Sequence, residues 1–349
     1  MHKETQPSSR MLWADILKFW GIFAIVWGHT LNGGVVHQYL YSFHVPLFFF
    51  VIGLYFKPPR ISFGCFCKRK AHSFLLPYFA FAIISVVIFM FLGEVGSSVL
   101  DADVTDFSLL TNVGKIFIGQ CRANRPLWLL PCMFVFYILC FAFSKLTMKC
   151  SDCVCTVICI LAIIGSVALC TLNSVVFNIK ALFWKIDVAV FMIYFFLIAI
   201  MAKRFLVQSS YNVSSTLLGI SFLLLGGIFA FQNSTVNYLS NSYGNILLFY
   251  VSSICTILGL CFISRVVSYI NILALNKALT YVGQRTLPIL LMHKFPILFF
   301  QVLFPWTRQP LKNNNPYVSL IVAIVSIVGC LIVYQIWKKI FYAIISKTR

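Results

Sequence analysis

Ionisable side chains that lie inside long apolar runs are the first candidates for chemistry in this 349-residue chain. The first run carries Asp15, Lys18 and His29, and His44 opens the second run after a short polar connection. Each such group is costly to place in a membrane, so it is a functional candidate by default. Two imidazoles that titrate near neutral pH and lie at a similar depth would suit proton transfer or metal binding.

In a helix, the three polar residues of the first run share one face. Lys18 follows Asp15 by three positions, so the two side chains can form an ion pair. His29 lies 14 residues beyond Asp15, which is nearly the same face and about 21 Å further along the axis. The ion pair could simply anchor a helix end, and a single His near a membrane surface is often only a packing residue. We take His29, His44 and Asp15 as the catalytic candidates.

Two further groups of candidates lie later in the chain. The basic cluster Lys68-Arg69-Lys70-Ala71-His72 precedes an apolar run that begins at Ser73, and such a cluster at a helix entrance can bind phosphate groups. Charge alone favours the simpler role of a positive anchor on the cytoplasmic side. His293 lies about eight residues into a late apolar run, which places it near the middle of the membrane.

The composition identifies the elements that must position these residues. Hydrophobic residues make up 61% and charged residues 10% of the chain, whereas soluble domains contain about 45–50% and about 25%. This composition excludes collagen-like, disordered, disulfide-framework and ordinary cytosolic classes. The roughly ten-residue alternation of a membrane β-barrel is absent. The sequence therefore predicts an all-α integral membrane protein with a single domain over residues 1–349.

Apolar runs of spanning length, about 17–25 residues, predict about ten transmembrane helices. They lie near 12–31, 41–56, 73–92, 127–144, 153–172, 186–202, 215–232, 245–263, 284–304 and 317–337. Pro46 would then fall in the first turn of the second helix, where proline is tolerated. The segment 93–126 would be the longest outer loop.

The distribution of basic residues orients these helices. The loops on one face, together with both termini, carry 18 Lys and Arg residues, against seven on the opposite face. This bias places both termini in the cytoplasm. The net charge of +19 then reflects loops beside anionic membrane lipid, and no nucleic-acid partner is expected.

Five segments carry a family resemblance. They are Trp13-Ala14-Asp15-Ile16-Leu17-Lys18 with Val26-Trp27-Gly28-His29, then His44-Val45-Pro46-Leu47-Phe48-Phe49-Phe50, then Arg69 to Tyr78 with its Leu-Leu-Pro-Tyr, then Pro126-Leu127-Trp128, and last Gly283-Gln284-Arg285-Thr286-Leu287 with His293. In this order they resemble the motifs of the acyltransferase-3 family. Its members are integral membrane O-acyltransferases that modify bacterial sugars and surface polysaccharides, and they include fucose 4-O-acetylase-like proteins.

The resemblance implies roles for the histidine of the first motif and for the basic cluster. His29 corresponds to the family's essential histidine, and Arg69 to the first arginine of its Arg-x-x-Arg cluster, which serves the acyl-CoA donor. This chain departs at the second arginine, where His72 stands. Lys68 or Lys70 could supply the missing charge.

The resemblance also implies the reaction and its location. An acetyl group would pass from cytoplasmic acetyl-CoA to a hydroxyl of a surface-polysaccharide or lipid-linked sugar, in the bacterial cytoplasmic (inner) membrane. Arg125, Trp128 and His293 would contact this carbohydrate acceptor. No metal is required. The sequence indicates neither the sugar nor an oligomeric state.

Acyl transfer to a sugar needs a base, because the pKa of a hydroxyl lies far above neutral. His29 is the candidate general base, with His44 as its orienting partner or as an alternative base. The developing oxyanion needs a donor, which Arg125, Trp128 or the backbone near His29 could supply. Because the basic cluster and His29 lie near opposite faces, the pantetheine arm of the donor would have to reach deep between the helices.

Two other classes of protein remain as alternatives. A transporter or flippase of a lipid-linked glycan would share the spans and the aromatic residues, but the chain shows no internal repeat of the kind found in many transporters. Cys150-x-x-Cys153-x-Cys155 and Cys65-x-Cys67 suggest a metal or redox protein. Thirteen cysteines spread over the chain are more typical of small buried apolar residues.

Overall fold

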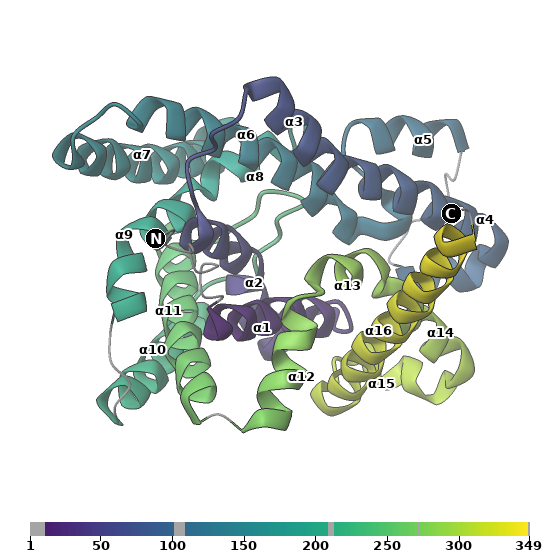
Figure 1. Ribbon diagram of the computed structural model, residues 1–349. Helices are drawn as coiled ribbons and strands as arrows, with labels where there is room; N and C mark the ends of the chain where they lie inside the picture. Colours follow the sequence, from purple (N-terminus) through teal and green to yellow (C-terminus); the bar gives the residue numbers. More distant parts are fainter. Residues whose placement is uncertain (1–10, 101–108, 209–212, 271, 348–349) are drawn as a thin grey trace.

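The computed structural model describes residues 11–100, 109–208, 213–270 and 272–347, and these residues form helices joined by short connections, without a strand (Figure 1). The first helices are α1 (Leu12–Gly28), α2 (Gly34–Tyr55), α3 (Phe63–Lys70), α4 (Leu76–Leu100), α5 (Leu109–Phe117), α6 (Leu129–Thr147), α7 (Asp152–Leu172), α8 (Ile186–Phe191) and α9 (Ile193–Gln208). The later ones are α10 (Val213–Gln232), α11 (Ile246–Ile270), α12 (Leu273–Gly283), α13 (Thr286–Met292), α14 (Lys294–Leu303), α15 (Arg308–Lys312) and α16 (Pro316–Lys347). Short 3-10 helices are η2 (Arg122–Trp128), η4 (Phe183–Lys185) and η5 (Pro305–Thr307), and η1 (Ala71–Leu75) and η3 (Asn173–Phe177) are π-helical.

Within the described residues, seven helical segments are long and apolar enough to cross a membrane. They are Gly34–Tyr55, Phe63–Phe91, Leu110–Thr147, Asp152–Phe177, Val213–Gln232, Ile246–Ile270 and Pro316–Lys339. Two bent helix pairs raise the number to nine if each pair is one span, and α1, with 17 residues, is at the lower limit of spanning length. The prediction of an all-α integral membrane protein is confirmed, while the count of ten spans stays a prediction.

Helix α1 is the central element of the bundle and contacts α2, α11, α12, α13 and α16. Asp15, which is 1% exposed, pairs with Lys18 at 2.6 Å as predicted, and its other oxygen accepts a hydrogen bond from Gln284 Nε2 at 3.0 Å. At Gly283 a Cβ would lie only 1.9 Å from the carbonyl oxygen of Asp15. Because only glycine permits this approach, the end of α12 packs directly on the start of α1.

Helix α2 begins much earlier than predicted. It starts at Gly34, where φ is +83°, so that the chain turns sharply from α1 into α2 at a residue without a side chain. Pro46 therefore lies inside the helix and not in its first turn, and it leaves the carbonyl of Ser42 without its usual N–H partner. Ser253 Oγ of α11 lies 2.5 Å from this oxygen and replaces the missing donor. The prediction failed because the polar residues before position 41 lowered the local hydropathy.

The predicted outer loop 93–126 is also wrong, because helices occupy most of its described part. Helix α4 continues to Leu100, and α5 and η2 follow from Leu109 and Arg122. Residues 101–108 lie outside the described part of the chain. The consequence for the site is that Arg125 belongs to a short helix packed on the bundle and not to a loose connection.

The span predicted at 284–304 is broken. Helices α13 and α14 meet at His293 with a bend of 49°. A broken helix inside a membrane is tolerated where its freed backbone groups find other partners or line a cavity. The bend is therefore a place at which to look for a cavity or for polar contacts between helices.

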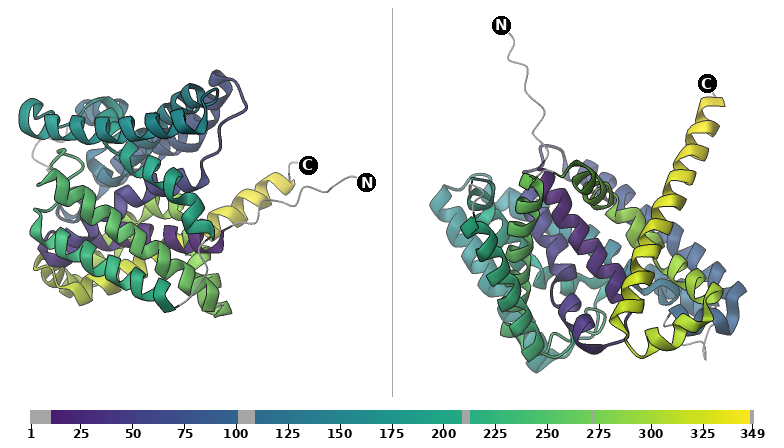
Figure 2. Two further views of the ribbon diagram at one scale, coloured as in Figure 1. Left: turned by 90° about the vertical axis from the view of Figure 1, so that its left-hand side faces the viewer. Right: turned by 90° about the horizontal axis from the view of Figure 1, so that it is seen from below.

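The start of α1 and the end of α16 lie on the same side of the bundle (Figure 2). The bias of basic residues predicts that this side faces the cytoplasm. In a cysteine-depleted variant, a cysteine at the exposed position 62 should resist an impermeant thiol reagent added to intact cells. A cysteine at the exposed position 313, on the opposite face, is the matched control and should react. Labelling of Ser62→Cys but not of Asn313→Cys would show that the protein has the opposite orientation in the membrane.

Candidate active site

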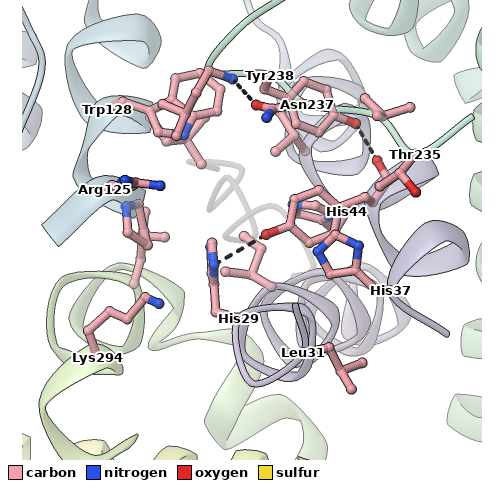
Figure 3. A pocket seen from close by; sticks show the side chains of 18 of the residues that line it. His29, Leu31, His37, His44, Arg125, Trp128, Thr235, Asn237, Tyr238 and Lys294 are labelled. Atoms are coloured by element: carbon pink, nitrogen blue, oxygen red, sulfur yellow. Dashed lines mark hydrogen bonds between the residues drawn. The ribbon is translucent and has the colours of Figure 1, made fainter. Parts of the chain in front are cut away.

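A cavity of about 440 Å³ lies at the end of α1. It is enclosed by α1, α2, η2, the bend between α13 and α14, and the connection 233–245 (Figure 3). Its volume is in the range of small-molecule binding sites. Its lining residues are Ile25, His29, Leu31, Asn32, His37, Tyr41, His44, Val45, Arg125, Pro126, Trp128, Leu129, Thr235, Val236, Asn237, Tyr238, Leu239, Leu290 and Lys294.

His29 follows the last residue of α1 and points into this cavity (Figure 3). Its Nδ1 lies 3.3 Å from the hydroxyl oxygen of Tyr41. Its ring centroid is 5.3 Å from that of His293, with 30° between the planes. Among the described residues Nε2 of His29 has no hydrogen-bond partner, so this nitrogen is left for a substrate.

His37, Tyr41 and His44 of α2 all line the cavity. They share one face of the helix because they follow one another at intervals of four and three positions. The rings of His37 and Tyr41 stack at 3.9 Å, and Tyr41 meets His44 edge to face at 4.7 Å. Nδ1 of the buried His44 lies 2.7 Å from the carbonyl oxygen of Leu40. A carbonyl only accepts, so Nδ1 carries the proton and Nε2 of a neutral ring is the acceptor. The structure thus brings His29 and His44 to one cavity.

The bend between α13 and α14 contributes two buried polar residues. His293 is fully buried, and its Nδ1 donates to the carbonyl oxygens of Ile289 and Leu290 at 3.1 and 2.9 Å. Its Nε2 has no partner among the described residues. Lys294, which is 2% exposed, extends into the cavity near His29 (Figure 3). The bend therefore adds a cation to the wall that holds the candidate base.

Helix η2 places Arg125 and Trp128 in the cavity (Figure 3). The residue before Arg125, Asn124, is 1% exposed and has an extended backbone that interrupts the helix. Its Nδ2 donates to Ser85 Oγ and to the carbonyl oxygen of Leu291, both at 3.3 Å. These bonds fix η2 against α4 and α13, so both side chains that follow project from a rigid support.

The connection 233–245 closes the remaining side of the cavity. Tyr238 stacks on Trp128, with 6.2 Å between centroids and 23° between planes. Its hydroxyl donates to the carbonyl oxygen of Tyr41 at 2.7 Å, and burial holds the pKa of Tyr238 well above its ordinary value, which keeps the donor protonated. The two rings form an aromatic wall that is attached to α2.

A buried polar cluster behind this wall holds the connection in place. Lys185, 2% exposed, donates through Nζ to the carbonyl oxygen of Leu239 at 2.6 Å. Asn241 donates to the carboxylate of Asp187. Lys185 itself has a φ of 54°, which is uncommon for a residue with a side chain. The polar contacts of this cluster explain why the chain accepts such a backbone here.

A second cavity of about 190 Å³ adjoins the first one. Leu129 and Leu290 line both cavities. Lys18 and Tyr137 line the far part of the second cavity, and Lys70 Nζ lies 3.5 Å from the centroid of the Tyr137 ring. The cavities thus follow one another from the basic cluster to His29, with two leucine side chains at their junction.

A family model described as an acyltransferase domain matches residues 11–335 of the chain. The chain belongs to the acyltransferase-3 family. It is therefore a multi-pass membrane acyltransferase, and every residue that lines the two cavities falls within the matched region. No match was found among curated proteins or among solved structures.

In this acyltransferase the predicted donor cluster lies apart from the cavity of His29. Lys68, Arg69 and His72 are exposed, and none of them lines either cavity. Lys70 is half-buried and turns toward Tyr137 and the second cavity. The four residues therefore separate into an exposed group and one inward cation.

Asp15 is the catalytic candidate that the structure separates from His29. It lies near the other end of α1 and lines neither cavity. Its contacts with Lys18 and Gln284 join α1 to the turn after α12. In the acyltransferase Asp15 has the contacts of a residue that positions helices.

Among the residues that the structure describes, no three His, Cys, Asp or Glu side chains are grouped to hold a metal ion. The thirteen cysteines are all free thiols. The spacing of Cys150, Cys153 and Cys155 therefore has no metal-binding counterpart in the fold of the acyltransferase. The candidates for chemistry are instead the imidazoles and the two cations, Arg125 and Lys294, that line the first cavity.

Sequence reasoning missed several residues of the cavity. The sequence contains a pattern that could have identified some of them, but not all. His37 and Tyr41 share a helical face with His44, which the pattern shows only if α2 is extended to its true start. Lys294 is an ionisable residue inside an apolar run, and so it carries the same signal that singled out His293. Tyr238 lies in a polar connection, and no feature of the sequence marks it.

Proposed function

We propose that this acyltransferase transfers an acetyl group from cytoplasmic acetyl-CoA to a hydroxyl of a surface-polysaccharide or lipid-linked sugar, in the bacterial cytoplasmic membrane. The observation that carries the proposal is the position of His29. Its free Nε2 faces a cavity that adjoins a second cavity leading toward the basic cluster. A donor and an acceptor that enter from opposite sides could therefore meet at this imidazole.

The second cavity supports a route for the donor. Its lining is largely apolar, which suits the methylene and methyl groups of a pantetheine arm, and Lys18 lies in its wall. In this proposal Lys70, at the edge of the cavity, binds the pyrophosphate, and the exposed Lys68 and Arg69 bind the phosphate on the ribose. The thioester would then lie between Leu129 and Leu290, beside the cavity of His29.

The first cavity supports a direct transfer from the thioester to the acceptor, without an acyl-enzyme. Nε2 of neutral His29 takes the proton of the acceptor hydroxyl as its oxygen attacks the thioester carbonyl carbon. The contact between Nδ1 and Tyr41 fixes the ring so that Nε2 faces the hydroxyl. The tetrahedral intermediate then collapses, the carbon–sulfur bond breaks, and the CoA thiolate takes the proton back from the imidazolium.

Lys294 is the best-placed donor to the oxyanion of the tetrahedral intermediate. It lies on the wall that carries His29, and it follows Leu290, one of the junction leucines, by one helical turn. A cation in a water-poor site stabilises developing negative charge far more than it would in water. Arg125 lies on η2 beside Trp128, whose ring stacks on Tyr238. This position suits a contact between Arg125 and the acceptor.

Purified protein in detergent with radiolabelled acetyl-CoA tests the proposal. We expect protein-dependent release of CoA and transfer of label to a carbohydrate acceptor, without added metal. A protein that releases no CoA under any condition, but moves a lipid-linked glycan across a vesicle membrane, would be a flippase and would contradict the proposal.

The donor route predicts that Lys70 and Arg69 both contribute to acetyl-CoA binding. Replacing Lys70 by Met or Arg69 by Ala should each weaken acetyl-CoA binding by about ten- to a hundredfold, because one charge-assisted phosphate contact is lost. Binding can be measured by isothermal titration calorimetry on purified protein. Arg60→Ala, an exposed arginine near the same face, is the control and should bind normally. Normal binding by both variants would leave the cluster as a topology anchor only.

The junction of the cavities predicts a steric block. Leu290→Trp should fill the passage and reduce transfer by about tenfold or more, because even a 1 Å displacement of reacting groups can cost a factor of about 100. Leu290→Met conserves volume and is the matched control. Initial rates of CoA release measure the effect. Equal rates in the Trp and Met variants would exclude this passage for the donor.

A further inference from the structure

The charge of the first cavity exceeds what the proposed reaction requires. Two cations, Arg125 and Lys294, extend into it, and three imidazoles accompany them. None of the described residues that line the cavity is Asp or Glu. Lys294 is buried, so a site built only for a neutral sugar would hold this charge at a cost in free energy. Arg125 is exposed, so its guanidinium is accessible to a ligand in the cavity.

The proposed chemistry uses one of these charges. The thioester is neutral, its oxyanion is a single transient charge, and the phosphates of the donor remain at the basic cluster beyond the second cavity. Lys294 is the cation assigned to the oxyanion. Arg125 is therefore left without a partner in the reaction itself.

Arg125 also lacks a partner among the described residues. Its side chain makes no hydrogen bond or ion pair with any residue that the structure describes, although Asn124 fixes the backbone beside it. Arg125 and Trp128 are three positions apart on a 3-10 helix, where such residues lie one above the other. Figure 3 shows both side chains directed into the cavity. The guanidinium and the aromatic wall are thus presented to the same ligand.

We propose, on the basis of the function proposed above, that the acceptor is an acidic glycan whose anionic group binds Arg125 while its sugar ring packs on the aromatic wall of Trp128 and Tyr238. A guanidinium binds carboxylate and phosphate groups through two parallel hydrogen bonds. The anion is either the carboxylate of a uronic-acid residue or a phosphate that links the sugar to its carrier. A neutral glycan would leave the charge of Arg125 unused.

The test compares acceptors that differ only in charge. Methyl hexosides of the gluco, galacto and manno series are paired with the corresponding methyl hexuronides, and a third arm uses the hexose 1-phosphates. Acetyl transfer to each is measured with purified full-length protein. We expect at least one charged acceptor to exceed its neutral partner in kcat/KM by about ten- to a hundredfold, the effect of one charge-assisted contact. A preference for hexuronide indicates the carboxylate, and a preference for hexose 1-phosphate indicates the carrier phosphate.

Arg125→Gln should abolish this preference and bring the ratio of charged to neutral acceptor close to one. Arg122→Gln is the matched control, since Arg122 belongs to the same short helix but does not line the cavity; its ratio should equal that of the wild type. Equal kcat/KM for neutral and charged acceptors in every series, or a preference that survives in Arg125→Gln, would overturn the inference.

A binding measurement separates this inference from the proposed function. The thermal unfolding temperature of the protein is measured with each hexuronide, hexose 1-phosphate and neutral hexoside, in the wild type and in Arg125→Gln. Stabilisation by a charged sugar that depends on Arg125 supports the inference even if no acetyl transfer occurs, a result that would contradict the function alone. Transfer to neutral acceptors without any such stabilisation supports the function and overturns the inference.

Discussion

Replacing His29 by Gln is expected to reduce acetyl transfer by about 10²–10⁴-fold, the usual contribution of a general base. The amide can keep the hydrogen bond with Tyr41, but it cannot accept a proton at neutral pH. Binding of acetyl-CoA should be unchanged, because the donor phosphates lie beyond the second cavity. Initial rates of CoA release with saturating acceptor, together with donor affinity, measure the two effects separately.

His37→Gln is the matched control for this prediction, since His37 lines the same cavity and stacks on the same tyrosine. It should retain most of the activity. Near-normal transfer by His29→Gln would make His29 a positioning residue and transfer the role of the base to His44, whose Nε2 is the acceptor of its neutral ring. In that case His44→Gln should show the large loss instead.

Much of the fold could be predicted from hydropathy, because a bilayer imposes long apolar helices. The errors arose where tertiary contacts replace what the local sequence lacks. Polar His37 and Gln38 hid the start of α2. In the structure His37 lines the cavity, and Gln38 Nε2 donates to the carbonyl oxygen of Ala230 at 2.9 Å. Pro46 was expected at a helix start because the sequence does not show that Ser253 serves the carbonyl left without a donor.

The candidate site was predictable where ionisable residues interrupt apolar runs. This signal located His29 and His44, and it also selected Asp15. A catalytic group and an ion pair that joins helices are both costly to bury, so the signal does not distinguish them. Which side of a helix faces a cavity depends on packing between distant segments. Tyr238, more than a hundred residues from its contact with Trp128, could therefore be found only in the structure.

Lys294 provides the second large prediction. Lys294→Met should lower kcat by about 10²–10³-fold, as expected when one donor to an oxyanion is removed. The KM for acetyl-CoA should change little, because the contact is made only when negative charge develops on the thioester oxygen. Steady-state kinetics of CoA release, with acetyl-CoA as the varied substrate, give both constants.

The stability of the same variant excludes a trivial loss of fold. The unfolding temperature of Lys294→Met is measured beside that of the wild type, and a loss of kcat in protein that unfolds at a similar temperature is the expected result. Lys294→Arg retains the charge and should recover part of kcat, which a purely steric role would not allow, because Arg is the larger side chain. A kcat of Lys294→Met equal to that of the wild type would show that another group stabilises the oxyanion. Arg125 is the remaining cation of the cavity and would take this role. An acceptor preference for anions would then need a different explanation.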